Sequence, residues 1–117
     1  MKDKRLDNHF RLIQIRGAIN EIESFVTGIN MDEFVSDSMI SSAVLFQFTV
    51  IGEAVTHIDN ELLNKYNYPW YQVRTFRNLI SHEYFNIEFK AVWEIIIKDL
   101  PELKKLIAII IQDFQVI

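Results

Sequence analysis

An arginine and a histidine five residues apart, Arg77 and His82, are the residues whose types and spacing best suit catalysis. A histidine that titrates near neutral pH can move protons, and a guanidinium can stabilise charge on phosphorane oxygens. The pair suits cleavage of RNA by its own 2′-hydroxyl, which leaves a 2′,3′-cyclic phosphate and requires no metal or other cofactor. Because one histidine cannot readily act as both base and opposite-side acid in one step, we expect a homodimer that supplies a second copy.

The residues around this pair predict a helix with one polar side. On a helical wheel of about 100° per residue, Asn78, Ser81 and His82 fall on the side of Arg77, and Tyr84 lies nearly in line with Arg77 two turns earlier. Asn78 and Ser81 are therefore expected to support the site. The opposite side is apolar and consists of Val73, Phe76, Leu79 and Ile80.

An exposed arginine and histidine on a helix are more often solvated or structural than catalytic, and the spacing Arg-x4-His alone would favour that interpretation. The fuller pattern, Arg-Asn-x3-His-x-Tyr, is expected by chance in only about one chain in ten thousand of this length, given typical residue usage. The fuller pattern therefore favours a functional site.

The charge distribution limits how this chain can hold nucleic acid. The net charge is -4, which argues against a broad basic surface. Residues 1–16 carry +3, residues 17–69 carry -7 and residues 70–117 are balanced. We therefore expect a local RNA contact that uses the N-terminal basic segment together with Arg74 and Arg77.

Length and composition predict one domain over residues 1–117, because half of the 117 residues are apolar. The chain has no cysteine, which excludes disulfides and thiolate metal sites. The charged N-terminus does not resemble a secretory signal, so we expect a cytoplasmic protein. The longest apolar run, residues 106–111, is far shorter than the ~20 residues of a membrane span and is expected to be a buried turn or an interface with a second copy or an antitoxin.

Apolar residues recur every three or four positions, which predicts an all-α, up-and-down bundle of about four to five helices. The first helix should cover about residues 6–27 and stop at Gly28. Asn30 should cap a short turn over residues 31–35, and Ser36 or Asp37 a long helix to about residue 66. The expected apolar side of the first helix consists of Phe10, Ile13, Ala18, Ile22 and Phe25.

The second half should contain a helix from about residue 70 to 85, which begins after the break at Pro69. Glu83 would then lie on its apolar side, which we can explain only if the helix is already loosening there. Asn86 should cap a final helix to the C-terminus, with a kink or restart near Pro101.

Several other residues have simpler interpretations than catalysis. His9 and His57 lack a second ligand three or four residues away, so both are interpreted as structural or surface residues and no metal site is expected. Gly52 next to Glu53 favours a close approach of two helices over a buried carboxylate at a dimer interface. The aromatic residues could form a base-stacking platform, but packing is favoured; they are Tyr68, Trp70, Tyr71 and Trp93.

The sequence resembles the HepT family, toxins within the larger group of HEPN helical domains, over essentially the whole chain. The specific stretch is Arg77-Asn78-Leu79-Ile80-Ser81-His82-Glu83-Tyr84-Phe85. Supporting stretches are residues 51–54 (IGEA), 69–70 (PW), 92–95 (VWEI) and 99–103 (DLPEL). Family members often carry a basic residue directly after the Pro-Trp pair, whereas this chain has Tyr71 there and Arg74 one turn later.

The resemblance implies a homodimeric, metal-independent ribonuclease, the toxin of a type II/VII-like toxin-antitoxin system that acts on tRNA or mRNA. Arg77 and His82 would line a cleft at the dimer interface. The partner would be a minimal nucleotidyltransferase antitoxin that attaches AMP to Tyr84, so that a negatively charged adduct blocks the cleft. The alternative is a non-catalytic helical interaction or nucleotide-binding subunit of a nucleotidyltransferase.

Overall fold

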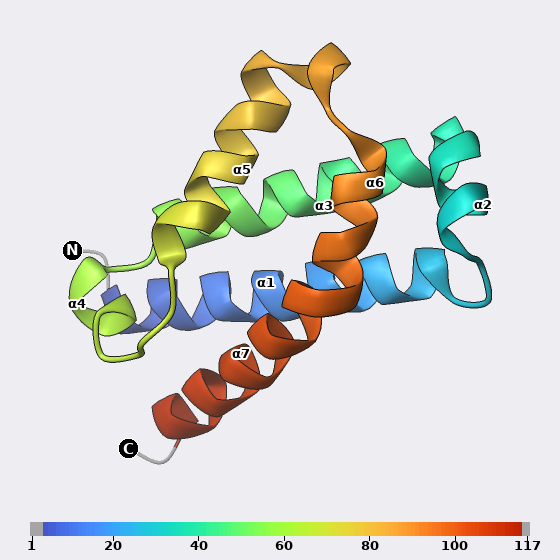
Figure 1. Cartoon of the computed structure of the whole chain (residues 1–117). Coiled ribbons are helices and arrows are strands. Elements are labelled where there is room, and N and C mark those ends of the chain that lie inside the picture. Colours follow the sequence, from blue (N-terminus) through green and yellow to red (C-terminus); the bar gives the residue numbers. More distant parts are fainter. Residues whose placement is uncertain (1–3, 116–117) are drawn as a thin grey trace.

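Two long antiparallel helices, α1 (Lys4–Val26) and α3 (Ser38–Thr56), lie side by side through the middle of the structure (Figure 1). The computed structural model describes residues 4–115, and these contain helices but no strand. The all-α prediction is therefore confirmed. The helix α5 (Trp70–His82) crosses α3, and α7 (Leu100–Gln115) crosses α1 (Figure 1).

Local signals set the ends of the first elements as expected. Gly28 stops α1 in the left-handed conformation, with φ of +79°. Asn30 caps α2 (Met31–Ser36) through a capping box with Glu33. The Asp37 side chain then caps α3 by accepting from two backbone N–H groups.

The predicted long helix to about residue 66 is wrong, because α3 ends at Thr56 and a separate turn, α4 (Asn60–Leu63), follows. A tertiary contact holds the segment between α3 and α4 in place. The buried Asn8 of α1 accepts a hydrogen bond from the Asp59 backbone N–H at 3.2 Å and donates to the Asp59 carboxylate at 3.3 Å. The contact joins residues 51 apart, so the local pattern could not reveal it.

The helix α5 begins at Trp70 as predicted and ends at His82, three residues before the expected end. Glu83 leaves the helix with φ of -131° and ψ of 34°, and a 3-10 turn, η1 (Tyr84–Asn86), follows. Glu83 therefore does not have to pack on the apolar side of α5, because the helix ends before it. The predicted cap at Asn86 is also wrong, since the Glu88 side chain caps α6 (Phe89–Glu94) instead.

The predicted interruption near Pro101, a kink or a restart, takes the form of a π-helical turn. A π-helical turn, η2 (Ile95–Asp99), joins α6 to α7, and Pro101 is the second residue of α7. Proline has no backbone N–H to donate to the preceding turn of an α-helix. A π-helical turn before it accommodates this missing hydrogen bond.

The core lies between α1, α3 and α7 and is closed at one end by α2 and α6, where the rings of Phe34 and Trp93 lie 5.4 Å apart. Phe10 was expected on the buried side of α1 but is exposed. The apolar run of residues 106–111 contributes mainly to the core, with Ile109 half exposed. Its buried members are Ile107, Ile110 and Ile111.

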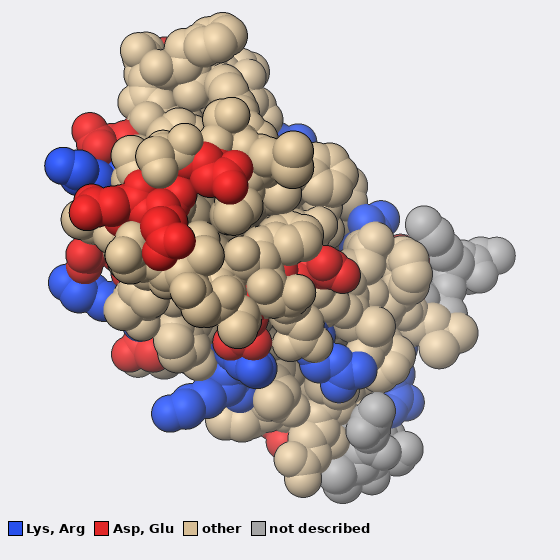
Figure 2. Space-filling model, turned by 90° about the vertical axis from the view of Figure 1, so that its right-hand side faces the viewer, with Lys and Arg blue, Asp and Glu red and all other residues tan. Residues whose placement is uncertain are grey.

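Among the described residues, α3 is long and apolar enough to cross a membrane by length and composition. In the structure it packs against both α1 and α5, and many of its apolar side chains are buried there. Figure 2 shows the end of the molecule near α2, where acidic side chains gather and basic side chains lie mainly below and beside them. Asp32, Glu33 and Asp37 are exposed at this end.

Candidate active site

The helix that carries the motif rests on α3 through its apolar side. Ile80 is buried, and the rings of Phe76 and Phe48 meet edge to face with centroids 5.1 Å apart. Leu79 was expected on the same side but is 43% exposed, because α5 rises away from α3 toward η1 (Figure 1). The motif helix is thus firmly seated at its middle, and its C-terminal end projects from the bundle.

Gly52 of α3 permits the two helices to approach closely at the motif arginine. A β-carbon on Gly52 would lie 2.3 Å from Cβ of Arg77 and 3.3 Å from the carbonyl oxygen of Val73. The predicted close approach at Gly52 is confirmed. It places the first carbons of the Arg77 side chain directly against the backbone of α3.

Arg77 is held by two oxygen acceptors. Its Nη2 donates to Oε2 of Glu53 at 2.5 Å, and its Nη1 donates to Oδ1 of Asn78 at 3.0 Å. The other oxygen of Glu53 lies 3.0 Å from Nε2 of His57, one turn further along α3. The guanidinium is therefore oriented by a carboxylate that a second ionisable group also contacts.

The contact between Glu53 and Arg77 is the part of the site that sequence reasoning missed. The signal was the pair Gly52-Glu53, since a glycine at a helix crossing brings the facing helix within reach of the next side chain. Without the crossing partner, Glu53 could not be assigned to Arg77. His57, interpreted as structural or surface, is exposed and contacts Glu53.

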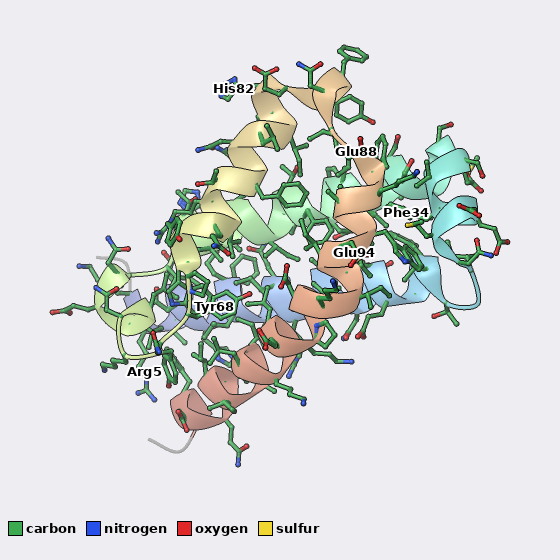
Figure 3. All side chains as sticks on the ribbon, in the orientation of Figure 1. Arg5, Phe34, Tyr68, His82, Glu88 and Glu94 are labelled. Atoms are coloured by element: carbon green, nitrogen blue, oxygen red, sulfur yellow. The ribbon has the colours of Figure 1, made fainter. Side chains whose placement is uncertain are left out.

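His82 is the last residue of α5 and its side chain points away from the bundle (Figure 3). It is exposed, and within residues 4–115 no hydrogen bond to its ring is found. Five residues of helix separate it from Arg77 by about 7.5 Å along the axis, on a different stripe. The structure thus places both residues on the same helix without a hydrogen bond between them. Ser81 is exposed beside His82.

The prediction that Tyr84 lies in line with Arg77 is wrong, because the α-helix ends before it. Tyr84 opens η1, and its hydroxyl lies 2.9 Å from that of Ser42 on α3. The phenol is 40% exposed. The hydroxyl is thus fixed against the N-terminal half of α3 and remains accessible from solvent.

Arg74, expected to contact RNA, lies one turn before Arg77 and donates to Oδ1 of Asn60 at 3.1 Å. This bond ties α5 to α4. Packing is confirmed for both tryptophans: Trp70 is buried and donates to the carbonyl of Leu63 at 3.0 Å, and Trp93 packs on Phe34.

The remaining histidine, His9, packs against the ring of Phe114, with ring centroids 5.5 Å apart. Within the described part of the chain, no three His, Asp or Glu side chains gather in a way that could hold a metal ion. Among the aromatic residues considered for stacking, Tyr71 is exposed and Tyr68 is half-buried against Trp70.

A family model described as Ribonuclease HepT-like matches residues 15–110. A protein of Methanocaldococcus jannaschii named as a putative RNase is 34% identical over 100 residues, which are 85% of this chain and 92% of that protein. One of Caldanaerobacter subterraneus subsp. tengcongensis with the same kind of name is 35% identical over 88 residues, 74% of this chain and 79% of that protein. A protein of Thermococcus cleftensis named probable ribonuclease HepT is 31% identical over 94 residues, which are 80% of this chain and 86% of that protein. No solved structure matches this chain.

Proposed function

This chain belongs to the family of HepT-like ribonucleases, and we propose that it is a metal-independent endoribonuclease whose active-site residues are Arg77 and His82. The observation that carries the proposal is the placement of these two side chains on α5. Arg77 is fixed by Glu53 and Asn78, whereas His82 is exposed at the projecting end of the helix. An anchored cation and an accessible imidazole on the same helix could supply charge stabilisation and proton transfer.

The reaction is a transesterification within RNA. The 2′-hydroxyl attacks phosphorus, which forms the 2′-O–P bond and breaks the bond to the 5′-oxygen. One His82 takes the proton of the 2′-hydroxyl, and a second His82 donates a proton to the leaving 5′-oxygen. Arg77 stabilises the negative charge on the non-bridging oxygens. The products are a 2′,3′-cyclic phosphate and a 5′-hydroxyl.

A homodimer would supply the second histidine. A single side-chain contact joins Tyr84 of η1 to Ser42 of α3, and Met39 and Phe46 flank Ser42 at helical spacing. Met39 is 80% exposed and Phe85, next to Tyr84, is 99% exposed. Exposed apolar side chains on these two elements favour association, and His82 lies two residues before Tyr84. The surface around Ser42 and Tyr84 is the expected dimer contact.

The wider role that we propose is that of a toxin neutralised by a nucleotidyltransferase antitoxin, which attaches AMP to Tyr84. The accessibility of the Tyr84 hydroxyl supports this proposal. Transfer would form a bond between the tyrosine oxygen and the α-phosphorus of ATP and release pyrophosphate. The adduct would bring a negative charge and a nucleoside to the end of α5 and displace the contact with Ser42. Mass spectrometry after co-expression should find one or more AMP units on wild-type protein and none on Tyr84→Phe.

A growth assay tests the proposed function and its alternative, a non-catalytic subunit of a nucleotidyltransferase. Expression of the wild type should stop growth, and Arg77→Ala or His82→Ala should restore it. Lys105→Ala, a charge loss at an exposed position of α7, should leave toxicity unchanged. Equal toxicity of His82→Ala and the wild type would refute the proposal, and purified wild-type protein that leaves RNA intact would favour the non-catalytic subunit.

A further inference from the structure

A groove beside Arg77 continues across α3 to α1. Its lining includes Arg11 and Gln14 of α1, Thr49 and Glu53 of α3, and Arg77 of α5. Three helices that are distant in sequence thus contribute polar side chains to one depression. Arg11 is the second arginine of this groove, and it lies outside the motif.

Both arginines of the groove carry an Nε atom that is buried and has no hydrogen-bond partner. The other bonds of these guanidinium groups are made at their Nη atoms: Arg77 to Glu53 and Asn78, and Arg11 to Oε1 of Gln14 at 3.2 Å. A buried donor without a partner costs stability unless a ligand or water satisfies it. Each of the two guanidinium groups therefore keeps hydrogen-bonding capacity that no contact among the described residues satisfies.

The charge of the groove indicates which acceptor it would take. Its lining contains two arginines and one carboxylate, Glu53, and that carboxylate is already bound to Arg77. Arg11 contacts the neutral amide of Gln14 and lies 5.8 Å from the ring centroid of Phe10. In a chain with a net charge of -4, this is a local excess of positive charge. The planar fork of a guanidinium fits two oxygens of a phosphate.

We infer that Arg11 binds a backbone phosphate of the RNA substrate, next to the phosphate held by Arg77. The RNA strand then runs from the end of α5 across α3 to α1, and the groove holds it without reading its bases. The inference rests on the proposed function, since it names the binding surface of the same substrate. It assigns to Arg11 a role in binding and none in proton transfer.

The test measures binding of a short, fluorescently labelled single-stranded RNA to His82→Ala protein, which cannot cleave it, at several salt concentrations. Addition of Arg11→Ala should weaken binding about tenfold, as expected for the loss of a charged hydrogen-bond pair. It should also reduce the slope of log affinity against log salt by about 0.7, the value of one lost contact to a single strand. Lys105→Ala removes the same charge from an exposed position of α7 outside the groove and should change affinity by less than about twofold.

Cleavage kinetics distinguish a failure of the inference about Arg11 from a failure of the proposed function. In the otherwise wild-type protein, Arg11→Ala should raise KM about tenfold and leave kcat within about twofold, because it removes substrate binding alone. Arg11→Gln keeps hydrogen-bonding groups without charge and provides a second variant if Arg11→Ala does not fold. Equal affinities and KM values for the Arg11 and Lys105 variants would overturn the inference and leave the proposed function intact. Absence of both RNA binding and cleavage in the parent proteins would overturn both.

Discussion

A β-carbon on Gly52 of α3 would lie only 2.3 Å from Cβ of Arg77 on α5, so the two helices approach closely at the arginine of the motif. The approach brings the guanidinium to Glu53, the next residue of α3. The position of Arg77 therefore depends on the absence of a side chain at residue 52, in a different helix from the motif.

Gly52→Ala should lower the free energy of unfolding by about 1–3 kcal/mol, because the added methyl must push α5 away, and it should reduce RNA cleavage. Gly17→Ala is the matched control. Gly17 lies within α1 with nothing within 4 Å of the added carbon, so that substitution should stabilise by about 0.5–1 kcal/mol. Urea denaturation and cleavage assays measure both effects. Equal stabilities of the two variants would contradict the close approach.

Glu53→Gln should separate binding from catalysis. The amide can still accept a hydrogen bond from Arg77, but the charged anchor is lost, so kcat should fall about tenfold. Removal of a negative charge beside the RNA phosphate should lower KM. The control is Glu21→Gln, at an exposed position of α1. An unchanged kcat would show that Glu53 does not position Arg77.

A shared active site predicts that His82→Ala protein inhibits the wild type. When both are mixed and allowed to exchange, each site of a mixed dimer lacks one proton-transfer group, so activity should fall more steeply than the wild-type fraction. His82→Ala that also carries Phe85→Asp should not inhibit, because a charge on the exposed ring position disfavours association. A decline strictly proportional to dilution would mean that one chain is sufficient.

Tyr66 should make stability sensitive to alkaline pH. Burial and the hydrogen bond from its hydroxyl to Asp113, at 2.7 Å, raise its pKa from 10.0 to about 12. The folded protein therefore keeps a proton that the unfolded chain loses, and the free energy of unfolding should fall as the pH rises from 10 to 12. Tyr66→Phe should cost about 1 kcal/mol at neutral pH.

The control for the alkaline loss is Tyr71→Phe, at an exposed tyrosine of α5. Denaturant titrations at several pH values should show a shallower alkaline decline for Tyr66→Phe than for Tyr71→Phe. Equal declines would show that Asp113 and burial do not act on Tyr66. Tyr68, whose pKa burial and nearby Asp99 also raise, should maintain a part of the decline in both variants.

Features set by neighbouring residues could be predicted from the sequence. Gly28, Asn30, Asp37 and Pro69 act on the backbone within a few positions, and each marks a helix end where it was expected. The end of α3 could not be predicted, since it depends on a contact between Asn8 and Asp59. Long-range contacts of this kind leave no trace in helical periodicity.

The candidate site also has features that the local sequence predicts and features that depend on long-range contacts. The motif itself indicates Arg77 and His82, because their types and spacing are readable along one helix. The partner of Arg77 could not be assigned, since Glu53 reaches it only through the crossing at Gly52. The predicted position of Tyr84 was wrong for a different reason. The helix ends at His82, and the Tyr84 hydroxyl lies against that of Ser42.

The central claim is that His82 carries out proton transfer in RNA cleavage without a metal. Purified wild-type and His82→Ala proteins should be incubated with total RNA in the presence of EDTA, and the ends of the products mapped. The proposal predicts 2′,3′-cyclic phosphate and 5′-hydroxyl ends from the wild type and intact RNA with His82→Ala. Cleavage by His82→Ala at the wild-type rate, or wild-type products with 3′-hydroxyl ends, would contradict it.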